Sequence, residues 1–249
     1  MPEEPPAGEW LDRYLAGETE RVWEAMLSRG PGIRNDRFIE SAEAVARATM
    51  KRVRANVETV IERLRDLGYQ FQRPDWVHIP PNPGDLARLE ELERRVGPVP
   101  LSLRAFYESV GSVDLTQSWE QLVHWHKPER SAASELQILG EYDPLVVGPL
   151  DDEAEKWAAR PGWFFLAPDE FHKANYSGGE NYHVALPDPR ADFPILGMYE
   201  IDEFFVAYLR ETFRNGGFRG RTGGDEERAW RVEPDLEVTK MLAVGLLPI

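Results

Sequence analysis

Residues 86–111 decide the fold, and they read LARLEELERRVGPVPLSLRAFYESVG. Apolar side chains recur every three or four positions from Leu86 to Val96, with charged residues between them, which is the pattern of an amphipathic helix with one buried stripe. Gly97 ends that helix and Pro98 prevents it from resuming. The same spacing from Leu103 to Val110 predicts a second, shorter helix that Gly111 ends. Two short amphipathic helices joined by so tight a corner need a sheet to cover them.

The residues ahead of the two predicted helices can cap them. Asp85 precedes the first helix and Ser102 precedes the second. Side-chain oxygens of both residue types accept hydrogen bonds from the free backbone N–H groups at a helix start. We therefore expect the helices to begin at Leu86 and Leu103.

The segment from Gly97 to Tyr107, followed by Gly111, resembles the signature of the SUKH superfamily, in which a Gly-x-Leu-Pro corner leads into an Arg-x-Phe helix. Val99 stands where that family usually has Leu. The resemblance implies a compact α+β domain over roughly residues 85–249. It also implies a protein-binding role, because many bacterial members are immunity proteins that bind and neutralise toxins, and others are fungal cell-wall signalling regulators.

The net charge of −15 is unevenly distributed along the 249 residues. Residues 1–84 hold 14 acidic and 12 basic side chains, a net charge of −2, and residues 85–249 hold the remaining 30 and 17, a net charge of −13. A nucleic-acid backbone attracts the opposite sign of charge, so we expect no nucleic-acid partner for the later region. An acidic surface instead suits a basic protein partner, although acidity can also serve solubility alone.

The composition excludes several functional classes. The chain has no cysteine, which removes disulfides, thiol nucleophiles and cysteine-based zinc sites. The first residues are not a basic segment followed by an apolar run, so they do not predict a secretory signal. No run of about 18 apolar residues predicts a membrane span. We therefore expect a cytoplasmic protein.

Residues 36–67 predict the longest helix, and its apolar side chains follow a seven-residue repeat. This stripe consists of Ile39, Ala46, Met50, Val53, Val57, Val60, Leu64 and Leu67. It needs a partner, for which the sequence leaves two alternatives. The helical segment at 10–29 together with the second domain can cover it, or a second copy of the chain can, which would make a homodimer or an adaptor.

After Gly111 the apolar period changes from 3.6 to 2, which predicts short strands. We expect strands near Val113–Leu115, Leu145–Val147, Trp163–Ala167 and Tyr182–Leu186, with Trp163–Ala167 as a buried central strand, and a helix over Ile201–Phe213 capped near Asp202. Residues 137–139 are a further short apolar run, and residues 151–159 predict a brief helix or turn. Helices first, strands next and a helix last is the order of an α+β fold. The sequence thus predicts a helical region, 1–84, and an α+β domain, 85–249, with a mostly antiparallel sheet of about five or six strands and flanking helices.

His124-Trp125-His126 is the most suggestive local cluster. On a strand, both histidines would lie on one face with Trp125 opposite, and two imidazoles at that spacing can share a metal ion. Zinc needs a third and a fourth ligand, which the sequence does not place nearby. Asp169 and His172, with the intervening Glu170, are a weaker candidate for acid–base chemistry, since no nucleophile is spaced around them. We expect no metal and no cofactor.

The densest acidic stretch lies close in sequence to tryptophans. Aromatic anchors beside charges are typical of energetic hot spots in protein interfaces. The predicted partner-binding residues are Glu141, Asp143, Asp151, Asp152, Glu153, Trp157, Trp119, His124 and His126.

The function that these observations favour is non-catalytic binding of a basic protein, such as a toxin domain, whose active site the chain would block. The resemblance carries the toxin part of this expectation. Two alternatives stay open: a metal-dependent hydrolase built on His124 and His126, and a structural adaptor that dimerises through the 36–67 helix.

Overall fold

The computed structural model describes residues 6–150, 162–197, 203–223 and 230–249, and they form an α+β fold, as predicted. The α-helices are α1 (Trp10–Leu15), α2 (Thr19–Leu27), α3 (Asp36–Asp66), α4 (Pro83–Val96), α5 (Leu101–Ser109), α6 (Glu135–Ile138), α8 (Glu170–Lys173), α9 (Phe205–Arg214) and α10 (Glu237–Ala243). The strands are β1 (His78–Ile79), β2 (Ser112–Asp114), β3 (Val146–Val147), β4 (Phe164–Ala167), β5 (Tyr182–Val184), β6 (Arg221–Gly223) and β7 (Trp230–Val232). No helix among these residues combines the length and apolar character that crossing a bilayer requires.

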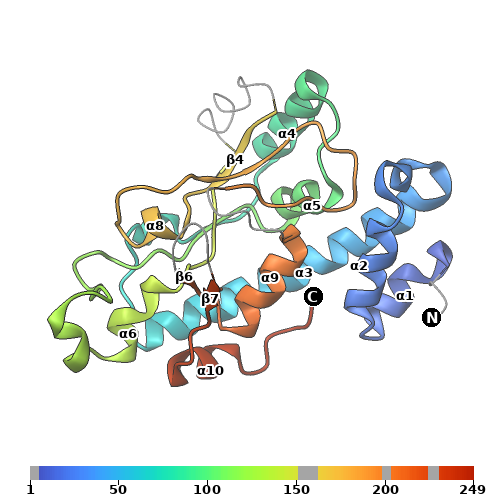
Figure 1. Cartoon of the computed structure of the whole chain (residues 1–249). Helices are drawn as coiled ribbons and strands as arrows, with labels where there is room; N and C mark the ends of the chain where they lie inside the picture. The colour runs from blue at the N-terminus through green and yellow to red at the C-terminus, as the bar shows by residue number, and fades with distance from the viewer. Residues whose placement is uncertain (1–5, 151–161, 198–202, 224–229) are drawn as a thin grey trace.

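Helix α3 runs along the length of the molecule, with α1 and α2 at one end and α6 and α8 toward the other (Figure 1). Its 31 residues span about 45 Å at the α-helical rise. The chain itself covers the middle of the predicted apolar stripe, because its six members from Ala46 to Leu64 are all buried, whereas Ile39 is partly exposed and Leu67 is exposed at the two ends. Helix α5 packs most extensively on α3, and α1 and α10 also pack on α3. Residues of both predicted regions thus belong to one hydrophobic core.

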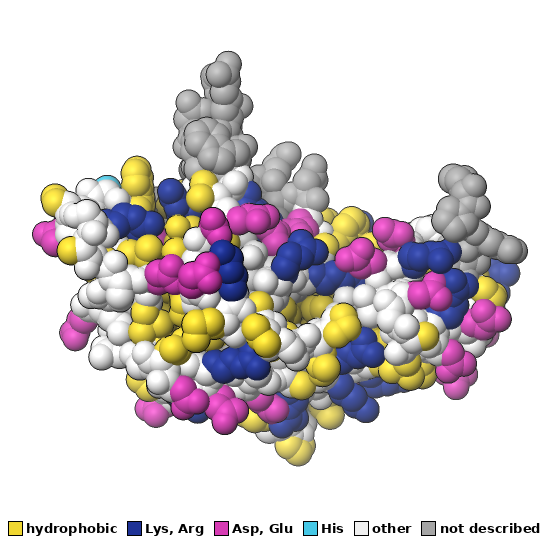
Figure 2. All heavy atoms as spheres, turned by 90° about the horizontal axis from the view of Figure 1, so that it is seen from below, with side chains coloured by type: hydrophobic (Ala, Val, Ile, Leu, Met, Phe, Trp, Pro, Cys, Tyr) yellow, Lys and Arg dark blue, Asp and Glu magenta, His cyan; other side chains and the backbone are white. Residues whose placement is uncertain are grey.

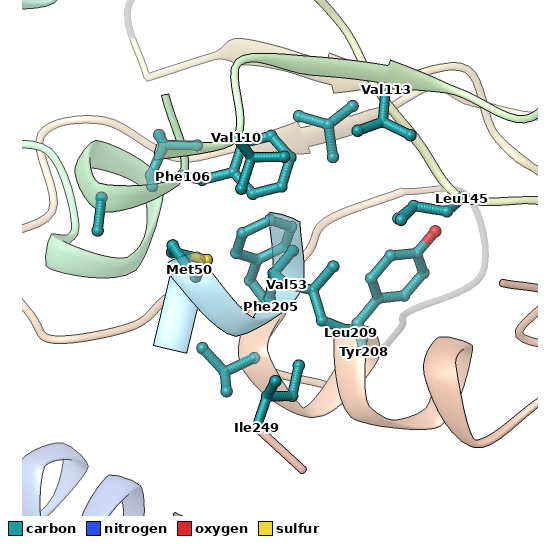
Figure 3. Packing of buried hydrophobic residues seen from close by; sticks show 14 of the residues in the cluster. Met50, Val53, Phe106, Val110, Val113, Leu145, Phe205, Tyr208, Leu209 and Ile249 are labelled. Atoms are coloured by element: carbon teal, nitrogen blue, oxygen red, sulfur yellow. The ribbon is translucent and has the colours of Figure 1, made fainter. Parts of the chain in front are cut away.

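The centre of that core lies where α3, α5 and α9 meet the first strands. Met50 and Val53 of α3 face Phe106 and Val110 of α5, and Phe205 of α9 packs between the two helices (Figure 3). The rings of Phe106 and Phe205 meet edge to face with centroids 5.5 Å apart. The second corner helix, α5, therefore buries its apolar face against α3 and α9 as well as against β4, and the first corner helix, α4, packs on α5.

The strands form three small antiparallel sheets in the described residues, and the predicted sheet of five or six strands is wrong for this part of the chain. The sheet orders are β1-β2-β3, β4-β5 and β6-β7. β4 is therefore not the central strand that its run of apolar residues predicts. The ring of Tyr107 on α5 packs against Phe164 of β4, and one backbone hydrogen bond, from Gly148 to Leu166, joins the end of β3 to β4.

Both predicted helix caps in the corner are wrong. α4 begins at Pro83, and Asn82 is its cap: the Asn82 side chain accepts from the Gly84 N–H, while Asp85 accepts from the Asn82 N–H, each at 2.9 Å. Asp85 is thus the second half of a capping box. In α5, which follows Pro100 directly, Ser102 lies inside the first turn and its hydroxyl donates to Asp192 at 2.6 Å.

Two further predictions differ from the structure. Residues 137–139, expected as a short apolar strand-like run, belong to α6 and to a 3₁₀ turn, because Ser134 and Gln137 form a capping box that starts a helix there. The predicted 201–213 helix begins at Phe205. Its predicted start at Ile201 and cap at Asp202 lie outside the described residues, as does the brief helix predicted over 151–159.

Asp192 caps α9 from a distant part of the chain. Its carboxylate accepts from the Val206 N–H at 2.9 Å and from the Ser102 hydroxyl, so it joins the first turns of α5 and α9. The side chain is buried, and burial raises the pKa of Asp192 to about 6 although the hydrogen bonds that it accepts act against that rise.

We expect the replacement Asp192→Asn to remove a pH dependence of stability. The folded state binds the Asp192 proton more tightly than the unfolded state does, so the free energy of unfolding falls as pH rises from about 4 to about 6, by about 1.4 kcal/mol per pH unit. The amide keeps an acceptor for Val206 and can donate to Ser102. Urea unfolding at pH 4 to 7 should show the variant gaining about 2–3 kcal/mol on the natural chain. Asp12→Asn at an exposed site is the control, and equal pH profiles for all three proteins would contradict the role of Asp192.

Candidate functional site

A buried carboxylate, Glu141, organises the largest polar and aromatic cluster that contains predicted site residues. His124 Nδ1 donates to Glu141 Oε1 at 2.9 Å. The Tyr176 hydroxyl lies 3.1 and 3.2 Å from the two carboxylate oxygens, and the Trp125 backbone N–H donates to Oε2 at 3.4 Å. These donors come from a loop and from the segment after α8, so Glu141 ties the two segments together.

The aromatic rings around this carboxylate form a continuous group. The imidazoles of His124 and His126 are nearly parallel with centroids 5.7 Å apart, and the Tyr176 ring lies 5.0 Å from the first and 5.9 Å from the second. Trp125 meets His126 edge to face at 6.1 Å. The two histidines lie close together, but the segment is a loop and turn, so the condition of a strand, with Trp125 on the opposite face, is not met.

Tyr176 acts as a hydrogen-bond donor in this cluster. Burial, reinforced by the neighbouring Glu141 carboxylate, raises the pKa of Tyr176 above its ordinary value. The phenol therefore stays protonated at neutral pH, as donation to a carboxylate requires. No sequence pattern singles out Tyr176, because it lies in an irregular segment whose neighbours in space are distant in sequence.

Asp143 is turned away from Glu141 and forms a separate buried ion pair. Its carboxylate accepts from Lys173 Nζ at 2.6 Å, and neither side chain has any exposed surface. The Tyr182 hydroxyl donates to the other carboxylate oxygen at 3.2 Å. Burial, the largest influence, lowers the pKa of Lys173, but the charge and hydrogen bond of Asp143 together with the contribution of Tyr208 outweigh it, so the pKa is raised and the amine stays charged. Asp143 has a positive φ of 46°, an unusual conformation that this pairing holds.

The structure therefore separates the predicted partner-binding residues. Glu141 and Asp143, expected on an acidic surface, are buried. His124 is partly exposed and His126 is exposed. Trp119 is 42% exposed and Trp125 is 52% exposed. Asp151, Asp152, Glu153 and Trp157 lie outside the described residues.

Trp119 and Trp125 border the same short helix. The Trp119 indole N–H donates to the carbonyl of Lys173, the last residue of α8, at 3.3 Å. Trp125 belongs to the ring group that includes Tyr176, three residues beyond the end of α8. Two exposed tryptophans are thus held beside α8 by the loop at 118–127.

The second predicted acid–base group has structural contacts. Asp169 caps α8: it accepts from the His172 backbone N–H at 2.9 Å and from the His172 ring at 2.5 Å. Glu170 accepts from the Thr222 N–H at 2.9 and 3.1 Å, so it fixes the β6-β7 hairpin. Among the residues that the structure describes, no group of three histidine or carboxylate side chains is arranged to hold a metal ion.

Comparisons with known proteins identify no relative: no family model, no curated protein and no solved structure matches the chain.

The buried pair between Lys173 and Asp143 yields a stability prediction. Lys173→Met leaves a buried carboxylate without its cation, which should cost about 3–5 kcal/mol of unfolding free energy. Adding Asp143→Asn removes the stranded charge and keeps a side chain that tolerates positive φ. We expect the double variant to be more stable than the sum of the two single effects predicts, by about 2 kcal/mol.

Urea unfolding of the two single variants and the double variant measures this coupling. The matched control is the exposed pair Lys240 and Glu237, replaced by Met and Gln, where the two changes should be additive because solvent screens the pair. Additive effects at Asp143 and Lys173 would contradict the pairing.

Proposed function

We propose that the chain is a non-catalytic protein-binding module that captures a basic protein partner, in the way that an immunity protein captures a toxin domain. The observation that carries the proposal is the pair of exposed tryptophans beside α8, in a chain of net charge −15. Trp119 and Trp125 offer large apolar surfaces with a polar N–H, the kind of side chain that dominates protein-interface energetics. The acidic charge would attract a basic partner before contact.

The immunity role within this proposal rests on the resemblance of residues 97–111 to the SUKH signature. Blocking a basic active site would need acidic groups close to the aromatic anchors. The excess of acids is not gathered on the face in Figure 2, where acidic and basic side chains are mixed. The sequence places a further group of acids at 151–155, directly after the strand residues 146–147.

Acid–base catalysis is the second candidate, and one observation favours it. The hydrogen bond from His124 Nδ1 to the buried Glu141 fixes the imidazole and leaves Nε2 as its other nitrogen, which is how a general base is oriented. A metal-dependent hydrolase on His124 and His126 would need further ligands. Metal analysis of untagged protein separates the metal-dependent hydrolase from protein capture. For a capture protein we expect less than one zinc ion per chain. Stoichiometric zinc that is lost in His124→Ala would favour the hydrolase.

The first test of capture uses the protein encoded beside this chain as the analyte and the purified chain as the immobilised partner. Trp125→Ala and Trp119→Ala should raise the dissociation rate about 30-fold, since interface hot spots contribute about 2 kcal/mol or more. Thr59→Ala on α3 is the control. Unchanged dissociation rates in both tryptophan variants would contradict the proposal, as would a lack of binding to either neighbouring gene product.

The second test addresses charge. Reversal to Lys at Asp151, Asp152 and Glu153 should slow association several-fold at low salt and have little effect at high salt, because exposed charges steer encounter and salt screens them. The matched control reverses the same number of exposed acids on α3: Glu40, Glu62 and Asp66. Equal effects of the two sets would show that only total charge matters and would contradict a role for the 151–153 acids.

A further inference from the structure

Two arginines beside the Glu141 cluster have no carboxylate partner within the described part of the chain, although acids outnumber bases in the sequence by 44 to 29. Arg130 lies in the 3₁₀ turn Pro128–Ala132, and Arg221 is the first residue of β6. The polar contact of Arg130 is a long one, 3.5 Å from Nη2 to the Tyr142 hydroxyl. Arg221 places its guanidinium over the Trp125 ring at 5.3 Å. Neither forms an ion pair with any residue that the structure describes.

Each guanidinium also has one buried nitrogen with no hydrogen-bond partner among the residues that the structure describes: Nη1 of Arg130 and Nε of Arg221. A buried donor that loses its water without gaining an acceptor costs free energy, and more so when it is charged. Native structures leave few such groups, and an unoccupied ion site is one of the reasons for those that remain.

One backbone hydrogen bond brings the segments that carry the two arginines to the same region. The Gly220 N–H donates to the Tyr142 carbonyl at 3.1 Å, so the residue before Arg221 is bonded to the residue whose side chain Arg130 contacts. Burial and Glu141 raise the pKa of Tyr176, and the positive charges of Arg221 and Arg130 act against that rise, which is consistent with both lying near its hydroxyl.

Glu141, the carboxylate at the centre of this cluster, forms no ion pair with either arginine. Glu141 already accepts hydrogen bonds from His124, Tyr176 and the Trp125 backbone, which occupy both of its oxygens. The ring of His126 is exposed at the edge of the same cluster and can add a further N–H donor.

We infer that Arg130 and Arg221 form an oxyanion site that takes the phosphate group of a small phosphorylated ligand, with Trp125 and His126 as its aromatic border. Guanidinium groups from two separate elements suit a tetrahedral oxyanion, which offers acceptors in several directions, better than one planar carboxylate. An exposed indole next to a phosphate site can stack an attached aromatic ring such as a nucleobase. This site goes beyond protein capture and does not depend on it.

The test is calorimetric titration of the full chain with inorganic phosphate, and separately with adenosine monophosphate. Arg130→Gln and Arg221→Gln should each weaken phosphate binding about ten-fold or more, the effect of removing a charge-assisted hydrogen bond. Arg214→Gln is the matched control, because Arg214 is exposed on α9 away from the cluster and should change affinity less than two-fold. If the base stacks on Trp125, Trp125→Ala weakens the nucleotide and leaves phosphate unchanged. If Trp125→Ala changes the affinity for phosphate and for the nucleotide equally, the base does not stack on Trp125 and the site is assigned to free phosphate.

Thermal unfolding with and without phosphate distinguishes a lost phosphate site from a variant that does not fold. Phosphate should raise the melting temperature of the natural chain and of Arg214→Gln, and should leave that of Arg221→Gln unchanged. No phosphate binding to the natural chain, or equal weakening in all three arginine variants, overturns the inference. Neither outcome bears on capture of a basic protein, which is measured with a different ligand and without the arginine variants.

Discussion

Burial of the apolar stripe of α3 is the constraint on which the rest of the structure depends. Ala46, Met50, Val53, Val57, Val60 and Leu64 have almost no exposed surface. Full burial of one Val, Leu or Met side chain contributes about 1.5–3 kcal/mol, so this stripe is a large share of what holds a marginally stable chain folded. The elements that cover it come from every part of the sequence. A homodimer built on the same stripe would have to displace this internal packing.

Hydrogen bonds between side chains and backbone groups that are distant in sequence hold segments of this fold together, as long sheets do in other proteins. Asn56 pairs with Leu247 through two bonds, from its amide N to the carbonyl at 2.9 Å and from the Leu247 N–H to its amide O at 2.7 Å. Arg63 donates to the carbonyls of Leu242 and Val244 at the end of α10. The strands in the described residues are two to four residues long, so isolated ladders would hold them weakly. Remote polar side chains fix the segments that strand pairing leaves loose.

The parts of the fold that the sequence predicted are those governed by local periodicity. The α+β class, the 36–66 helix and the paired corner helices follow from the spacing of apolar residues, which neighbouring residues determine. The errors arise where a distant residue decides the outcome. Ser102 donates to Asp192, 90 residues later, in place of capping its own helix. β4 reads as a central strand because it is apolar, but periodicity does not distinguish burial under helices from burial in a sheet.

The candidate site shows the same limit. Three of its members, His124, Trp125 and His126, are adjacent in sequence and stood out as a motif. The sequence predicts Glu141 as an acid of a binding surface. In the structure Glu141 is a buried hydrogen-bond acceptor, and that role depends on Tyr176 and on the loop backbone. Arg130 and Arg221 lie far apart in sequence and carried no signal. Chemistry that depends on convergence of distant segments is visible only once those segments are placed.

The arrangement around Glu141 bears on what the exposed rings can do. A carboxylate that already accepts from an imidazole, a phenol and a backbone N–H has little capacity left for a ligand, so its contribution is to hold the loop. A loop held in this way presents Trp125 and His126 with much of their conformational freedom already lost. Ordering side chains at an interface costs roughly 0.5–1.5 kcal/mol for each flexible group. Preorganised rings avoid part of that cost, which favours recognition of a ligand or partner at this rim over a role for Glu141 in chemistry of its own.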